Sequence, residues 1–157
     1  MKNQSLILHL ALLSLAEQAT RDPLTKLYNR RYFNETLTDQ IAVATRYNRP
    51  LSLLLLDLDH FKKINDTHGH LQGDQLLCTF AQHITQTIRD ADIACRYGGD
   101  EFAILLPETT PDGATELLHR LQQNTPHPFS AGLASLPVPN LLQDADKNLL
   151  LKKNANP

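Results

Sequence analysis

The sequence contains few of the residues that define several specialised classes of protein. It has two cysteines, six glycines and nine prolines among 157 residues. Cys78 and Cys95 are too few for a disulfide framework and lack metal-ligand spacing. Each lies in an apolar run, which favours core packing over the alternative of a single structural disulfide. The glycine and proline contents exclude a collagen-like or low-complexity chain, and a hydrophobic fraction of 41% excludes wholesale disorder.

An excess of charge of one sign is also absent. There are 15 basic and 17 acidic side chains, which gives a formal net charge of −2. This balance provides no general attraction to nucleic acid or to an anionic membrane, and we expect no nucleic-acid partner. Any phosphate group that the protein binds must therefore be held by a local site.

No hydrophobic run is long enough for a membrane span, which needs about 20 residues. The candidate run Leu6–Ala16 is far shorter and is interrupted by His9. Lys2 before this run leaves a signal peptide as an alternative, but the helical pattern continues to Thr20 without a small-residue cleavage pattern. We predict an amphipathic or coiled-coil-like helix over residues 1–21, and its many leucines suggest burial against a partner.

The remaining chain predicts one domain in which helices and strands are mixed. The continuous apolar run Leu51–Leu56 is typical of a strand buried on both faces, and the polar segment Phe61–Gly69 is interpreted as a connecting loop. Taken with the N-terminal helix, the order of elements predicts one layered α/β domain. Helices are expected over about Asn29–Tyr47, Gln72–Arg89, Pro111–Gln123 and Leu141–Lys153, and further strands over Ile93–Tyr97, Phe102–Leu106 and Phe129–Leu136.

Two carboxylates end the predicted buried strand. Because strand side chains alternate, Asp57 and Asp59 should leave on one face while Leu58 points away. Carboxylates in a dry setting repel each other unless a cation lies between them, and Mg²⁺ prefers such oxygen ligands. Asp59 could equally cap a helix that begins at His60. For Asp57, burial without a partner would be costly, which favours a ligand.

The segment Gly98–Glu101 joins two predicted strands as a hairpin, with glycines where positive φ is expected. Gly98 and Gly99 would let a bulky anionic ligand approach the backbone closely, and Asp100 and Glu101 could add a metal ligand and a general base. An ordinary hairpin turn is the alternative. Joined to Asp57 on a neighbouring strand, the segment predicts a carboxylate and metal site for phosphoryl or nucleotidyl transfer.

The polar segment from Phe61 to Asp74 supplies a third group of candidates. Lys62 or Lys63 could neutralise a triphosphate, and Asn65 and Asp74 could read the edge of a purine. Taken alone, the segment is better explained as a polar connector that makes turns. His68 and His70 are too close together in a flexible loop to indicate a metal site.

Four stretches of the sequence carry a recognisable combination of motifs: Asp22–Thr25 with Leu27 and Asn29–Arg31, Asp57–Asp66, Gly69-His70 with Gly73-Asp74, and Arg96–Phe102. In this order they resemble the GGDEF family of diguanylate cyclases. The last stretch contains the family's signature pentapeptide unaltered, and the match extends from about Asp22 to the C-terminus. The resemblance divides the chain into an N-terminal signalling or dimerisation helix, residues 1–21, and a GGDEF domain, residues 22–157.

The resemblance implies a fold and an activity. The fold would be a palm-like nucleotide-cyclase sheet flanked by helices, an α/β (α+β) architecture. The activity would be the Mg²⁺-dependent condensation of two GTP into cyclic di-GMP with release of two pyrophosphates, across a homodimer. An upstream sensor domain and a cytoplasmic location would accompany it.

The resemblance also implies roles for particular residues. Asp57, the backbone carbonyl of Leu58 and Asp100 would hold Mg²⁺ or Mn²⁺. Glu101 or Asp100 would help to deprotonate the attacking 3′-hydroxyl, and Lys62 would offset phosphate charge. Arg89 and Asp92 match the family's RxxD site for inhibition by the product, the alternative being an arginine placed favourably at a helix C-terminus. The implied substrate-binding residues are Phe61, Asn65, His70, Asp74, Gly98, Gly99 and Lys153.

The chain also departs from the family pattern. The stretch before Phe129 is short and lacks a β-hairpin, Leu150 replaces the usual aromatic residue, and Pro157 stands where an arginine is expected. These departures support an alternative, a catalytically weak or degenerate module that binds GTP or cyclic di-GMP as a sensor or scaffold.

Overall fold

A computed structural model describes residues 2–155 and shows six helices and five strands in that range. In chain order they are α1 (Lys2–Thr20), β1 (Tyr28–Asn29), α2 (Arg30–Tyr47), β2 (Leu51–Leu58), α3 (Phe61–His68), α4 (His70–Thr87), β3 (Ile93–Arg96), β4 (Glu101–Pro107), α5 (Pro111–Gln122), β5 (Phe129–Ser135) and α6 (Leu141–Ala155). The mixed α/β fold class expected from the sequence is confirmed.

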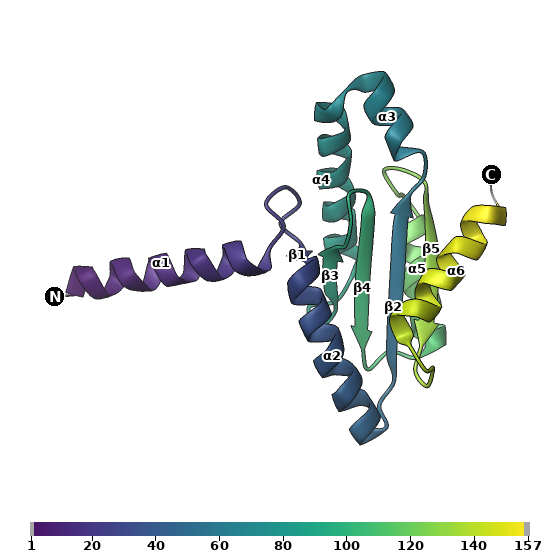
Figure 1. The fold of residues 1–157 in the computed structure, drawn as a ribbon, viewed down its shortest axis with the longest axis horizontal. Coiled ribbons are helices and arrows are strands. Elements are labelled where there is room, and N and C mark those ends of the chain that lie inside the picture. The colour runs from purple at the N-terminus through teal and green to yellow at the C-terminus, as the bar shows by residue number, and fades with distance from the viewer. Residues whose placement is uncertain (1, 156–157) are drawn as a thin grey trace.

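The five strands form one sheet in the order β1-β3-β4-β2-β5 (Figure 1). β2 lies between β4 and β5 and is antiparallel to both, whereas β1 pairs with β3 in parallel. Every residue of β2 is buried, which confirms the strand predicted from the run of leucines. Leu54 and Leu56 join the core formed with α4 and α5, and Leu53 and Leu55 join the core formed with α2 and α6. Helices therefore cover both faces of the strand that carries Asp57.

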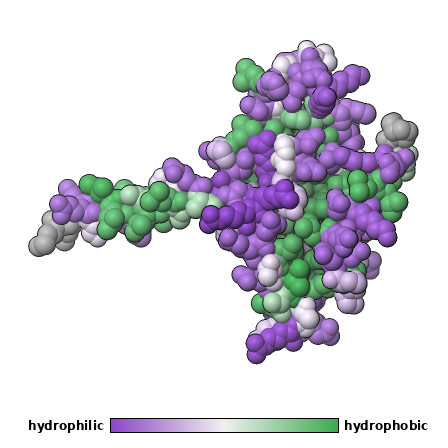
Figure 2. Space-filling model, in the orientation of Figure 1, coloured by the Kyte–Doolittle hydropathy of each residue, from purple (hydrophilic) through white to green (hydrophobic). Residues whose placement is uncertain are grey.

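The helix α1 projects away from the rest of the chain (Figure 1). Its leucines and isoleucine are 51–66% exposed, and Figure 2 shows a continuous hydrophobic surface along it. Within residues 2–155 no helix is both long and apolar enough to cross a membrane. The predicted N-terminal helix is thus present, and its apolar side chains contact solvent in the single chain.

The prediction of a connecting loop over Phe61–Gly69 is wrong, because residues 61–68 form the helix α3. Asn65, Asp66 and Thr67 have low helix propensity, which explains the misinterpretation. Phe61 packs against the core, and the N–H of Gly69 donates to the Asn65 carbonyl at 2.9 Å, ending the helix at a residue with φ of 85°. α4 begins immediately afterwards, at His70 rather than at the expected Gln72.

Candidate active site

The carboxylates of Asp57 and Glu101 are neighbours across two strands. Asp57 pairs with Glu101 of β4 and with Ser130 of β5 in the antiparallel register, and Asp57 is 6% exposed. The N–H of Leu58 donates to the carbonyl of Asp100 at 3.1 Å, which ties the turn before β4 to the end of β2. The structure therefore brings together the acidic residues that the sequence analysis singled out on separate segments.

The carboxylates in this cluster disfavour one another's charge. Burial raises the pKa of Asp57, and the charges of Asp100 and Asp59 raise it further, against a hydrogen bond from Lys153. Burial also raises the pKa of Glu101, followed by the charges of Asp57 and Asp100. Mutual repulsion of this kind is relieved by a cation placed among the carboxylates.

The donor set suits a hard divalent cation. Two carboxylates, Asp57 and Asp100, and the Leu58 carbonyl offer only oxygen, the ligand atom that Mg²⁺ and Mn²⁺ favour. Within the described part of the chain, no group of three or more His, Cys, Asp or Glu side chains is placed to hold a metal ion. An ion at this position would need backbone or substrate oxygens in addition to carboxylates.

Asp59 does not cap a helix, contrary to one of the two interpretations of its role. The N-cap of α3 is His60, which makes no side-chain cap hydrogen bond. Asp59 Oδ1 instead accepts a hydrogen bond from the Ser130 hydroxyl at 2.8 Å, and its N–H donates to the Pro128 carbonyl at 3.0 Å. Asp59 therefore fastens the segment after β2 to the beginning of β5.

A cleft of about 330 Å³ lies beside the carboxylates, between α3, the start of α4 and the turn before β4. Seven predicted site residues line it: Phe61, Lys62, Asn65, His70, Asp74, Gly99 and Asp100. Leu77 and Arg96 also line it, and the sequence analysis did not select them. Arg96 lies two residues before Gly98, in the stretch that carries the family signature, and this proximity could have identified it as a site residue. Gly98, Glu101, Asp57, Leu58 and Lys153 do not line this cleft.

One atom in the cleft wall lacks a partner. Asn65 Oδ1 is buried and has no hydrogen bond among the described residues. A buried acceptor left unsatisfied costs about 1–3 kcal/mol, and such groups in native proteins call for an explanation. A ligand that donates a hydrogen bond here would remove the cost.

The positive φ expected at Gly98 and Gly99 is wrong. Among the described glycines only Gly69 has positive φ. A Cβ at Gly98 would collide with the Glu101 carboxylate and would force that side chain to move. The Gly99 carbonyl accepts hydrogen bonds from Arg96 Nη2 at 2.8 Å and Nε at 3.2 Å. The turn is therefore shaped by these contacts and not by left-handed backbone.

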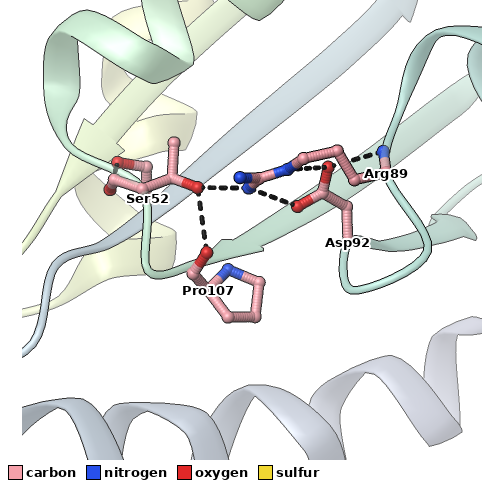
Figure 3. Close-up of polar contacts among 5 residues, drawn as sticks. Ser52, Arg89, Asp92 and Pro107 are labelled. Atoms are coloured by element: carbon pink, nitrogen blue, oxygen red, sulfur yellow. Dashed lines mark hydrogen bonds and ion pairs between the residues drawn. The ribbon is translucent and has the colours of Figure 1, made fainter.

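Arg89 and Asp92 lie apart from this cleft and line a different cavity of about 230 Å³. Figure 3 shows Asp92 accepting from the backbone N–H of Arg89 at 2.9 Å and from its Nη2 at 2.9 Å. Arg89 Nη2 also donates to Thr109 Oγ1 at 2.7 Å, and Thr109 donates to the Pro107 carbonyl at 2.9 Å. The Asp92 hydrogen bond and charge raise the pKa of Arg89.

The central strand β2 thus ends in carboxylates that repel one another, beside an open polar cleft. The sequence profile of the family described as "Diguanylate cyclase, GGDEF domain" matches residues 19–156. The chain belongs to this family. The predicted resemblance is thereby confirmed.

Named relatives agree with this membership. The chain is 43% identical over 108 residues to "Response regulator PleD" of Caulobacter vibrioides, covering 69% of this chain and 24% of the relative. It is 36% identical over 129 residues to "Probable diguanylate cyclase DgcC" of Escherichia coli, covering 82% and 33%. The chain thus spans about a quarter to a third of the length of these curated relatives.

A solved structure is similar over nearly the whole chain. The coiled coil and GGDEF domain of DgcB from Caulobacter crescentus, in complex with c-di-GMP, superposes with a TM-score of 0.90 at 27% identity. The match covers 99% of this chain and 91% of that one. The similarity therefore includes α1 as well as the sheet.

Proposed function

We propose that the chain is a diguanylate cyclase that condenses two GTP molecules into cyclic di-GMP and two pyrophosphates. The observation that carries the proposal is the cluster of Asp57, Asp100 and Glu101, whose charges repel one another, and of which Asp100 lines the neighbouring polar cleft. The family membership and the names of relatives support the same reaction.

The proposed metal ligands are Asp57, the Leu58 carbonyl and Asp100. A bound Mg²⁺ or Mn²⁺ would neutralise phosphate charge and lower the pKa of a coordinated hydroxyl. Since net charge attracts no phosphate to this protein, such an ion would supply most of the attraction for a triphosphate.

The remaining cleft residues have proposed roles in holding GTP. Asn65 and Asp74 would read the guanine edge, and the unsatisfied Asn65 acceptor supports this assignment. Phe61 and His70 would enclose the base, and Lys62 would offset charge on the phosphates. Gly98 and Gly99 would allow the close approach of the nucleotide to the turn before β4.

Glu101 or Asp100 would accept the proton of the attacking 3′-hydroxyl. A bond then forms between that oxygen and the α-phosphorus of the second GTP, and pyrophosphate leaves with the electrons of the broken bond. The raised pKa of Glu101 supports its choice as the base, since a carboxylate with a higher pKa takes up a proton more readily.

Two domains must face each other, because each cleft would hold one GTP and the product joins two. We propose α1 as the dimerisation helix, on the grounds of its exposed leucines and of the coiled coil described for the DgcB relative. An upstream sensor domain and a cytoplasmic location, where GTP is plentiful, belong to the same proposal.

Arg89 and Asp92 are proposed as a product-binding site that restrains the enzyme. The side chain of Arg89 is 56% exposed and that of Asp92 only 1% exposed. Arg89 would therefore contact the ligand, while Asp92 would hold the Arg89 side chain in place. The DgcB relative, described in complex with c-di-GMP, supports a binding site for this nucleotide in the fold.

A second candidate function is a module that binds GTP or cyclic di-GMP without turnover. The ion pair between Lys153 and Asp57 favours this second function, because it engages a carboxylate that the proposed metal ion would need. Incubation of the concentrated protein with GTP and Mg²⁺, followed by chromatography, separates the two. Wild type and the exposed control Asp39→Asn should form cyclic di-GMP, and Asp57→Asn should not. Nucleotide binding without product in all three would support the module instead.

A further inference from the structure

The lysine closest to the carboxylate cluster comes from the last helix of the chain. Lys153 lies in the last turn of α6, and its Nζ is 2.6 Å from Asp57 Oδ2. The Asp57 side chain is 9% exposed and that of Lys153 is 39% exposed. The carboxylate is thus fixed in the protein, while the lysine reaches it from the side open to solvent.

The packing of α6 determines where this lysine can reach. Leu141, Ala145 and Leu149 are buried against the sheet. Gly132 of β5 permits a close approach, because a Cβ there would collide with the backbone of Ala145 and Leu149. In Figure 1 the C-terminal half of α6 runs beside β5 toward the end of β2 where Asp57 lies. The contact between Lys153 and Asp57 therefore follows from the fold of the domain.

Lys153 is also the positive charge that acts on the cluster as a whole. Its charge lowers the pKa of both Asp57 and Glu101. The other charges raise these pKa values: those of Asp100 and Asp59 act on Asp57, and those of Asp57, Asp100 and Asp146 act on Glu101. One ammonium group thus offsets the repulsion of several carboxylates. A divalent cation among the same oxygens would do so more strongly, because it carries twice the charge.

The two cations compete for the same carboxylate, that of Asp57. A metal ion bound by Asp57 and the ammonium of Lys153 in direct contact with Asp57 Oδ2 would repel each other at close range. We propose that Lys153 acts as an internal cation that holds Asp57 in the nucleotide-free protein and is displaced from it when a divalent ion binds. This inference rests on the metal site of the proposed function and adds an exchange step to it.

The exchange sets a cost on metal binding before the nucleotide arrives. Breaking the ion pair subtracts its stabilisation from the affinity for the metal. Once displaced, the ammonium remains attached to α6 beside the site. The nucleotide-free domain therefore has a lower affinity for the metal ion than the same carboxylates would have without Lys153.

The affinity of the nucleotide-free protein for Mn²⁺ tests this exchange. It can be measured by calorimetry and by the electron paramagnetic resonance signal of free Mn²⁺. Lys153→Met should bind Mn²⁺ about five- to tenfold more tightly than wild type. The control Lys152→Met, which removes the same charge one residue away, should stay within about twofold of wild type. Equal affinities in the two lysine variants would overturn the exchange.

Two further measurements separate the exchange from the metal site itself. Asp57→Asn should abolish the binding, whereas Mn²⁺ binding unaffected by Asp57→Asn in every background would refute both the exchange and the proposed metal site. In ¹⁵N spectra of the lysine ammonium groups, the signal of paired Lys153 should be sharp without metal and should broaden or shift when Mg²⁺ saturates the protein. A Lys153 signal unchanged by Mg²⁺ in a protein that binds it would also overturn the exchange.

Discussion

Replacing Asp92 by alanine should destabilise the domain, whatever happens to ligand binding. The carboxylate accepts from the backbone N–H of Arg89 at 2.9 Å, from Nε at 3.3 Å and from Nη2 at 2.9 Å, and its side chain is 1% exposed. Hydrogen bonds to charged groups contribute about 1.5–3 kcal/mol, but water replaces part of this because the Arg89 side chain is 56% exposed. We expect a loss of about 2 kcal/mol, a shift in Tm of about 4–8 °C.

Urea unfolding followed by circular dichroism measures this loss. Asp90→Ala is the matched control, because Asp90 is exposed and carries the same charge two residues away. We expect Asp90→Ala to remain within about 0.5 kcal/mol of wild type. If Asp92→Ala unfolds at the same urea concentration as Asp90→Ala, the ion pair of Arg89 with Asp92 does not stabilise the chain and the structural role assigned to Asp92 is refuted.

Three other variants test the site. Glu101→Gln should abolish the cyclic di-GMP product detected by chromatography. The folded protein holds the Glu101 proton more tightly than the unfolded chain does, because the pKa of Glu101 is raised. The stability of wild type relative to this variant should therefore fall as the pH rises from 4.5 through the raised pKa. A stability difference independent of pH would contradict that pKa. Arg96→Ala should free the Gly99 carbonyl and raise KM for GTP severalfold, whereas the exposed control Arg31→Ala should not; equal KM values would count against Arg96. Arg89→Ala should relieve product inhibition, and an unchanged inhibition curve would remove Arg89 from that site.

The parts of the fold that depend on apolar periodicity could be predicted from the sequence. A continuous run of leucines has few alternatives to a strand buried on both faces, and β2 is such a strand. α3 could not be predicted, since its polar residues favour turns and its stability comes from the packing of Phe61 and the hydrogen bond from Gly69. Tertiary contacts here override local propensity.

Most residues of the candidate site could be predicted from the sequence, but the contacts between them could not. Seven of the nine residues that line the cleft were predicted, because they lie in stretches that resemble the GGDEF family, whereas Leu77 and Arg96 were not. The contact of Lys153 with Asp57 depends on the close packing of α6 over Gly132, which no local pattern specifies. The bond of Arg89 to Thr109 has the same origin, because it joins the segment after α4 to the segment after β4.

The most direct measurement of the central claim is the ratio of products formed from GTP and Mg²⁺ by the concentrated protein. Chromatography quantifies cyclic di-GMP, and a coupled phosphate assay quantifies pyrophosphate. The account predicts two pyrophosphates for each cyclic di-GMP, with neither formed by Glu101→Gln. Bound GTP that yields no cyclic product in a demonstrably dimeric sample would contradict it.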